Sequence, residues 1–455
     1  MTGRKSTRSA PGEVRTLDMA IFIILVLVVA ALGGSSRFDM VQGPPLQLGA
    51  WIILGVLVAT AARPLAAKPL LFLALAYCGW LALTLIPLPH GVWTMLPGRE
   101  DIAQLEEALG LSFARPLSLD PQRTLNALGL MAIPLAGILA VSRLGERAVI
   151  TVLTACVALA VLSATLAFIQ QATGQLYLYA ITNDGKPVGI FANTNHHAVF
   201  VVIGLAIAAW LFDTLKLWPK GFSGFAAVLL FLSALTSTSR GGFLCLLVAL
   251  AFIAWLAPRR VLGEERRQRL GLTPRRLALV AAGGGAIAVA LLLPLLSSVP
   301  AIDRIVGADP LQDRRFEILP HTLAMARDFL PFGVGIGAFE DVYYAYELPQ
   351  NLRPEYVNMA HNDIAQLLAE GGIVMAGFVI AVIVLAIRRA RARLGAEDAN
   401  TQDSGFIGLA TAILAILVVA SAFDYPLRTA IHQLSATMLL TLLWMPPLPR
   451  PRHLR

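Results

Sequence analysis

The stretch AVITVLTACVALAVLSATLAFI, residues 148–169, decides the class of fold. It carries no charged side chain over its whole length, and a helix needs about 20 such residues to cross the apolar core of a bilayer. The rest of the chain is similar, since 57% of its 455 residues are hydrophobic, 14% are charged and the mean hydropathy is +0.71. A soluble domain of this size does not bury so much apolar surface, so the sequence predicts a membrane protein.

Twelve apolar runs are long enough, or nearly so, to span a bilayer. We therefore expect one all-α, polytopic membrane domain over residues 1–455, with about twelve transmembrane helices. The expected spans are 18–34, 46–62, 69–87, 124–142, 148–169, 194–212, 223–239, 241–257, 277–299, 365–387, 405–423 and 429–446. The division between the seventh and eighth spans depends on Arg240, the one residue left between them.

The basic residues predict the orientation of this bundle. If the N-terminus is cytoplasmic and the spans alternate, cytoplasmic segments carry 24 of the 36 Lys and Arg residues, most densely in 258–276 and 388–393. Such clusters orient membrane proteins, so we expect both termini in the cytoplasm and no nucleic-acid partner. The first span is expected to be an uncleaved signal anchor because eleven spans follow it. The three cysteines all fall in spans and are expected to be free apolar residues.

The longer polar connections all fall on the opposite, outer side. The largest is 301–363, between the ninth and tenth spans, which contains five arginines, two histidines and several aromatic residues. Long connections of this kind are uncommon unless they have a function or are disordered, and this one is too aromatic for disorder. The span interiors hold almost no ionisable residue, which argues against an ion-coupled transporter. The pattern favours chemistry at one membrane face.

Three arginines on the outer side are candidates for binding an anion. Arg240 lies in TSTSRGGF (236–243), where the two following glycines permit close approach of a ligand. Arg314 and Arg315 open a predicted amphipathic helix, RRFEILPHTLAMARDFL (314–330). Guanidinium groups stay charged and match phosphate oxygens, so a diphosphate site is one interpretation. The alternatives are an interfacial topology marker for Arg240 and local salt bridges for the other two.

Histidines stand at the outer ends of two spans. His361 precedes the tenth span in HNDIAQLLAEGG (361–372), where Asn362 or Asp363 is the expected N-cap. A neutral imidazole there can take a proton from a sugar hydroxyl, although a structural role is commoner for a lone histidine. His196 and His197 open the sixth span together and cannot face the same way on a helix.

Two further motifs bear on ligands. Asn193 and Asn195 precede the histidine pair and are candidate capping or sugar-binding amides. GVGIGAF (333–339) predicts a tight turn and not a dinucleotide site, since no strand–turn–helix unit surrounds it. No carboxylates stand near the histidines at metal-ligand spacing, so no metal is predicted.

Three segments together resemble the O-antigen ligase and polymerase family: GIFANTNHHAVF (189–200), TSRGGF (238–243) and the series within 314–372. The resemblance covers residues 189–375. It implies a GT-C-like enzyme of the bacterial inner membrane, with short helices in its periplasmic loop 301–363. Such an enzyme transfers an undecaprenyl-diphosphate-linked glycan to an acceptor sugar at the periplasmic face, with inversion, and uses no metal or other cofactor.

The family's essential residues can be placed on this sequence. Its loop histidine matches His361, its arginine between the central spans matches Arg240, and its large-loop arginine best matches Arg315. The family's tryptophan four residues later is Leu319 here, which leaves Arg314 as a rival for the last role. The resemblance implies catalysis by the first three, whereas the expected substrate-binding residues are Arg314, Asn193, Asn195, His196 and Asn362.

The acceptor stays open between two alternatives. A ligase would use a lipid-A-core sugar, and a polymerase would use a lipid-linked repeat unit of O-antigen or exopolysaccharide. PLSLDPQRT (116–124) is similar to exopolysaccharide polymerases. More remote alternatives are a transporter of lipid-linked sugars and a peptidoglycan glycosyltransferase, which has fewer spans.

Overall fold

The computed structural model describes residues 16–60, 65–214, 218–261, 314–349, 357–396 and 401–446. Six helices in these ranges are long and apolar enough to cross a membrane, and five shorter apolar helices accompany them. Each coincides with a predicted span, which confirms an α-helical, multi-pass membrane protein. The predicted span 277–299 lies outside the described residues, so the number of twelve stays a prediction.

The elements are as follows, in chain order: α1 (Thr16–Leu32), α2 (Gly43–Ala59), α3 (Lys68–Thr84), β1 (Pro87–Leu88), α4 (His90–Trp93), α5 (Glu100–Ala108), β2 (Arg115–Pro116), α6 (Pro121–Leu130), α7 (Ala132–Arg143), η1 (Gly145–Arg147), α8 (Ala148–Thr173), α9 (Thr194–Thr214), α10 (Trp218–Thr236), α11 (Arg240–Val261), α15 (Arg314–Asp328), α16 (Phe339–Tyr343), α17 (Asp363–Leu394), α18 (Thr401–Phe423), η4 (Pro426–Arg428), α19 (Ala430–Thr441) and η5 (Leu442–Trp444). The all-α prediction is confirmed, with one short antiparallel pair, β1–β2, of two residues in each strand.

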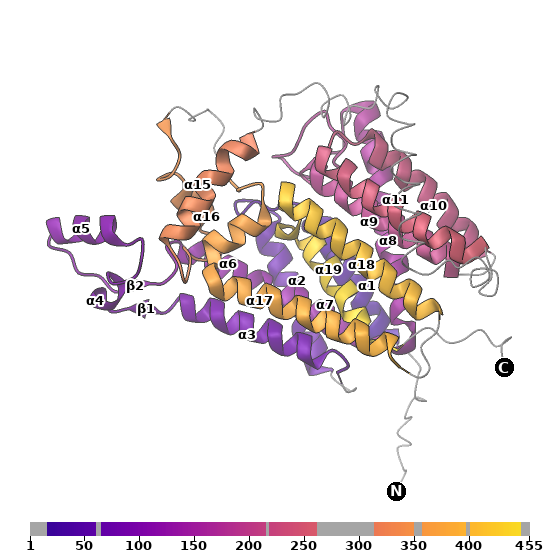
Figure 1. Ribbon diagram of the computed structural model, residues 1–455, viewed down its shortest axis with the longest axis horizontal. Helices are drawn as coiled ribbons and strands as arrows, with labels where there is room; N and C mark the ends of the chain where they lie inside the picture. The colour runs from indigo at the N-terminus through magenta and orange to yellow at the C-terminus, as the bar shows by residue number, and fades with distance from the viewer. Residues whose placement is uncertain are drawn as a thin grey trace, which may run out of the picture.

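Helix α9 is the centre of one half of the bundle (Figure 1). Every residue from Val199 to Ala208 is buried, as expected for a helix that is apolar all round. It packs against α8, α10, α11 and α18. Gly204 allows the close approach, since a Cβ atom there would lie 2.5 Å from that of Ala160 on α8. The division at Arg240 is also confirmed, because α10 and α11 are separate helices.

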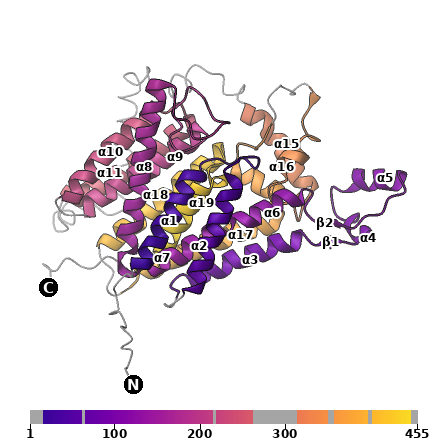
Figure 2. The ribbon, with the colours of Figure 1, turned by 180° about the vertical axis from the view of Figure 1, so that it is seen from behind.

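The other half of the bundle is more open. Helices α1, α2, α7 and α19 pack together, and α3 and α17 lie side by side along its flank in both views (Figures 1 and 2). In α3 only Leu70, Leu81 and Thr84 are buried, although the whole helix is apolar. It contacts α6, α7 and α17.

The segments predicted to be outer meet at one end of the bundle, where Figure 1 shows α4, α5, α15 and α16. Backbone hydrogen bonds join them in pairs. The amide of Ala192 donates to Gly34, that of Leu119 donates to Val334, and that of Asp363 donates to the carbonyl of Asp424. Which side of the membrane this end faces stays a prediction.

The described part of the 301–363 connection is a folded cap. Helix α15 confirms the predicted amphipathic helix. Its Ile318 and Met325, with Phe329 just after it, share a small apolar core with Phe339 and Tyr343. GVGIGAF is the predicted tight turn, with positive φ at each of its three glycines. A Cβ atom on the first of them would overlap the backbone at Glu370, which fixes the cap on α17.

Candidate active site

His361 and Asp424 form a pair at the junction of the cap and the bundle. Nδ1 of His361 lies 3.4 Å from Oδ1 of Asp424, and their side chains are 29% and 6% exposed. Burial by itself raises the pKa of the Asp424 carboxyl, but the nearby His361 and the charge of Arg315 help to outweigh it and hold the pKa below its ordinary value. The pair is an ionised carboxylate beside a partly exposed imidazole.

The backbone at His361 is strained. Its φ is +52°, in the left-handed region that a residue with a Cβ rarely adopts. Three contacts of the neighbouring residues hold this backbone in place. The Ala360 amide donates to Gln366 Oε1 at 2.9 Å, Asn362 caps α17, and the Asp363 amide donates to the carbonyl of Asp424. Strain that the surrounding structure enforces in this way is common at functional sites.

Tyr425 links this pair to α9. Its ring lies 5.0 Å from that of His361 on one side and 5.0 Å from that of His196 on the other, measured between centroids. Its hydroxyl is held by the side chains of Asn193 and Asn358. The segment before α9 and the segment before α17 thus meet on one buried aromatic ring.

The two adjacent histidines have different environments, as predicted. His197 is fully buried and lies between Ser163 Oγ of α8 at 2.9 Å and Ser233 Oγ of α10 at 3.1 Å. His196 is turned toward Tyr425, and neither of its ring nitrogens has a hydrogen-bond partner among the described residues. Only His196 therefore faces the site.

Arg240 is brought to the same region by its glycines. A Cβ atom on Gly242 would lie 2.5 Å from that of Ala198 on α9, and one on Gly241 would lie 3.7 Å from that of Phe423. Ala198 is two positions after the histidine that faces Tyr425, and Phe423 immediately precedes the carboxylate of the pair. The start of α11 is thus wedged between the two helices whose ends form the site.

The first turn of α15 carries the other two arginines. The charge of Arg315 acts on both Asp424 and Tyr425, which places it near the pair. The side chain of Arg314 lies outside what the structure describes. The structure therefore places Arg315 near the pair. The choice between Arg314 and Arg315 for the role of the large-loop arginine stays a prediction.

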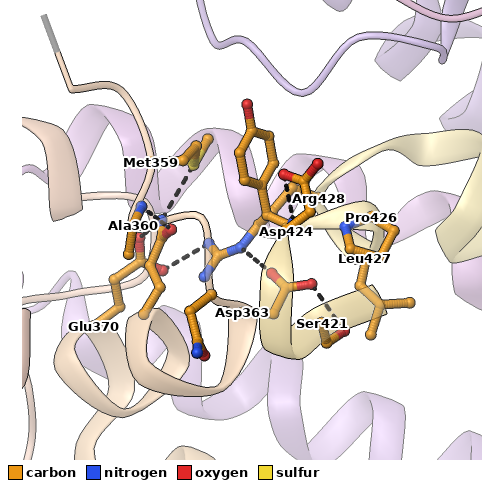
Figure 3. A network of polar contacts seen from close by, with 12 residues as sticks. Met359, Ala360, Asp363, Glu370, Ser421, Asp424, Pro426, Leu427 and Arg428 are labelled. Atoms are coloured by element: carbon orange, nitrogen blue, oxygen red, sulfur yellow. Dashed lines mark hydrogen bonds and ion pairs between the residues drawn. The ribbon is translucent and has the colours of Figure 1, made fainter. Parts of the chain in front are cut away.

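A second network of charges, centred on Arg428, lies close to Asp424 (Figure 3). Arg428 Nη1 donates to Glu370 Oε2 at 2.7 Å, and its Nε lies 3.4 Å from Asp363 Oδ1. Ser421 Oγ donates to the other oxygen of Asp363 at 3.2 Å. The two carboxylates raise the pKa of Arg428 in spite of its burial. These contacts tie η4 to the start of α17.

The predicted asparagines all lie at helix starts. Asn362 is the N-cap of α17, where its Oδ1 accepts from the Ala365 amide at 3.0 Å and its Nδ2 donates to the Ala422 carbonyl at 3.1 Å. Asn193 Oδ1 accepts from the amide of Asn195, at the start of α9, at 2.8 Å. These contacts give Asn362 and Asn193 structural roles; substrate binding by the three stays a prediction.

Sequence reasoning missed Asp424, Tyr425 and Arg428. The available signal was SAFDYPLRT (421–429), a very short connection between two apolar spans that still holds two opposite charges. Among the described residues, no three His, Cys, Asp or Glu side chains lie together so as to hold a metal ion.

Residues 225–375, about a third of the chain, match the model of the O-antigen ligase family. The matched region runs from α10 to the start of α17 and includes Arg240, Arg315 and His361. No curated protein matches the chain.

Proposed function

Because residues 225–375 belong to the O-antigen ligase family, we propose that the protein transfers an undecaprenyl-diphosphate-linked glycan to an acceptor sugar at the periplasmic face of the bacterial inner membrane. The observation that carries the proposal is the His361–Asp424 pair at the end of the bundle where Arg240 and Arg315 also lie. In this proposal a base and two cations act together there, from three separate parts of the chain.

His361 acts as the general base in this proposal. Its Nδ1 faces the Asp424 carboxylate, which favours the tautomer that carries the proton on Nδ1. Nε2 is then free to accept the proton of the acceptor hydroxyl as that oxygen attacks the anomeric carbon. Asp424 does not touch the substrate, so it is a positioning residue that orients the imidazole and stabilises its protonated form.

Arg240 and Arg315 bind the leaving group. As the new bond from the acceptor oxygen to the anomeric carbon forms, the bond from that carbon to the phosphate oxygen breaks and its electron pair leaves with the diphosphate. Two guanidinium groups stabilise that developing charge, and removing one such contact from an active site typically costs about 10²- to 10³-fold in rate. The configuration of the anomeric carbon inverts because attack and departure occur on opposite faces.

The test is transfer from purified undecaprenyl-diphosphate glycan in lipid nanodiscs. We expect His361→Ala, Arg240→Ala and Arg315→Ala each to lose transfer by about 10²-fold or more. Arg327→Ala on the same helix α15 is the matched control, because its side chain is 78% exposed. Full transfer by His361→Ala would overturn the assignment of the base.

The lipid profile of cells that lack the protein separates ligase from polymerase. If repeat units still polymerise but no longer reach lipopolysaccharide, the protein is the ligase. If single repeats are still attached and long chains are lost, it is the polymerase. A transporter would instead leave transfer by the purified protein at background.

A further inference from the structure

The segment from β1 to β2, residues 87–116, is a separate projection at the end of the bundle where the site lies, and we call it the arm. In both overall views its helices α4 and α5 stand clear of the bundle (Figures 1 and 2). The two strands close its base, with Pro87 opposite Pro116 and Leu88 opposite Arg115. The arm contributes no residue to the site described above, so its role must be a different one.

The arm is joined to the cap by a buried cation. Arg99 is buried, and its Cζ lies 5.3 Å from the ring centroid of Trp93 and 5.0 Å from that of Phe329, just after α15. Its Nη2 donates to the Leu117 carbonyl at 2.8 Å. A Cβ atom on Gly98 would overlap the ring of Phe329. The arm is therefore packed closely against the end of α15, and this packing determines which of its faces points outward.

Helix α5 buries an acid and exposes its leucines. Within Glu100–Ala108, which the structure describes throughout, the one buried residue is Glu106. Its carboxylate accepts from Arg115 Nε at 2.7 Å and lies 3.4 Å from His90 Nδ1. Leu105 and Leu109 are 60% and 61% exposed, and at a spacing of four residues they share one face. An ordinary surface helix has the opposite orientation, with its apolar face on the core.

The rest of the arm exposes apolar side chains as well. These are Val92, Met95, Leu111 and Phe113. Apolar surface that stays in contact with water forgoes the free energy of burial, and a concentration of it marks an interaction site more often than not. A partner that covers the leucine face would recover that free energy.

The unpaired charges on the surface of the arm are all negative. Glu100, Asp101 and Glu107 are exposed, and none of them forms an ion pair with another described residue. Of the two arginines of the arm, one is buried and the other is paired with Glu106, and the arm contains no lysine. Asp101 is four positions before Leu105 and so lies on the leucine face. This apolar face thus has an acidic border.

The acidic border selects among the possible occupants of the leucine face. A membrane surface that contains anionic lipid repels an acidic face. A symmetric contact between two copies of the chain puts the same surface on both sides, so acid would face acid. A different protein with basic side chains around an apolar centre meets neither obstacle, and the opposite charges favour its approach.

We propose that the arm docks a partner protein on Leu105 and Leu109, through an apolar segment of that partner flanked by lysine or arginine. This inference goes beyond glycan transfer and does not depend on it.

The experiment places a photoreactive phenylalanine analogue at position 109 of the full-length protein, in the cells that produce it. We expect irradiation to give an adduct with a different protein, attached in an apolar segment of net positive charge that mass spectrometry identifies. The double variant Asp101→Lys/Glu107→Lys should reduce the adduct about tenfold. Asp184→Lys is the matched control, since this acid is exposed outside the arm and its reversal should leave the adduct unchanged.

Two further measurements separate docking from folding. The double variant should keep the Tm of the wild type, because both acids are exposed and unpaired. Leu105→Gln, which leaves the charges in place, should also reduce the adduct about tenfold. The analogue at Leu323, which is 47% exposed on α15, should give less than a tenth of the adduct.

Each other outcome has a definite meaning. Adducts with lipid only, with a second copy of the chain only, or no adduct from position 109 would overturn the proposal. An adduct with another protein that the charge reversal leaves unchanged would overturn the stated chemistry of the partner. Transfer by the purified double variant should equal that of the wild type. A wild-type protein that forms the adduct but transfers no glycan would overturn the proposed function and still support docking.

Discussion

His361 reaches Asp424 across the junction of two helices, with 3.4 Å between Nδ1 and Oδ1. The histidine precedes α17 and the carboxylate follows α18. The backbone amide of Asp363 also donates to the carbonyl of Asp424. Two separate contacts thus hold the same short segments together.

Replacing the carboxylate should slow the reaction without weakening donor binding. In Asp424→Asn the volume is kept but the charge that orients His361 is lost, so we expect kcat to fall about 10- to 100-fold. The double variant with His361→Ala should be no slower than His361→Ala alone, because the two act as one unit. Steady-state kinetics with purified donor measure this. A double variant far slower than His361→Ala would contradict a positioning role.

The same carboxylate should make stability depend on pH in the acid range. The pKa of Asp424 is lowered in the folded protein below its ordinary value of 3.8. Its ionised form therefore stabilises the fold above that pH, and this contribution is lost as the pH falls toward the folded-state pKa. We expect Asp424→Asn to have a lower Tm than wild type at pH 6 and a smaller deficit near pH 3. A deficit that stays constant over this range would contradict the assignment.

Loss of Arg428 should destabilise the protein strongly. Arg428→Met leaves Asp363 and Glu370 buried without their cation, and breaking a buried ion pair from one side costs about 3–5 kcal/mol. The control is Arg327→Met on α15, whose pair with Asp328 is exposed and should be worth about 1 kcal/mol or less. Unfolding in detergent followed by fluorescence gives both values. Equal effects in the two variants would show that the buried network is not important for stability.

Two glycines of α17 should respond in opposite ways to alanine. Gly372 has φ +57° and a Cβ atom there would overlap the backbone of Pro331, whereas Gly377 has open space around it. We expect Gly372→Ala to lower stability by about 1–3 kcal/mol. Gly377→Ala should raise it by about 0.5–1 kcal/mol through better helix propensity. Thermal melts of the two variants decide the point, and a neutral Gly372→Ala would show that the non-helical backbone at this residue of α17 is not required.

Substitution of the two adjacent histidines should affect different properties, transfer activity for one and stability for the other. His197→Ala removes the bridge between Ser163 and Ser233 and should lower Tm. His196→Ala removes no hydrogen bond but takes away the ring that packs on Tyr425. It should mainly reduce transfer. Thermal melts and transfer assays of both variants test this. A loss of transfer confined to His197→Ala, with a lower Tm only in His196→Ala, would contradict the assignment.

Much of the bundle could be predicted because lipid imposes a simple rule on sequence. Every span of a helical membrane protein must satisfy its backbone internally and present apolar side chains, so runs such as 148–169 are visible in the sequence. The division between α10 and α11 at Arg240 was also predicted, since a single charged residue between two apolar runs indicates the membrane interface. The N-cap at Asn362 and the tight glycine turn followed from equally local rules.

The site could be predicted only in part. Arg240, Arg315 and His361 could be proposed because they stand out as polar groups in named motifs. Asp424 was missed because its role depends on which helix end lies beside His361. The local sequence of the turn 424–428 does not indicate that neighbour. The pairing of Arg428 with Glu370 likewise joins residues on α17 and η4 whose meeting depends on how the helices pack.

The sequence by itself determined that this protein is a helical membrane protein, that its reactive side chains gather at one end, and which histidine and arginines to consider. These properties depend on composition and on spacing along a single helix. The tertiary structure alone decided which carboxylate lies beside His361 and which of two neighbouring histidines packs on Tyr425. Such relationships depend on the positions of helices relative to each other, which packing determines over distances that no local pattern spans.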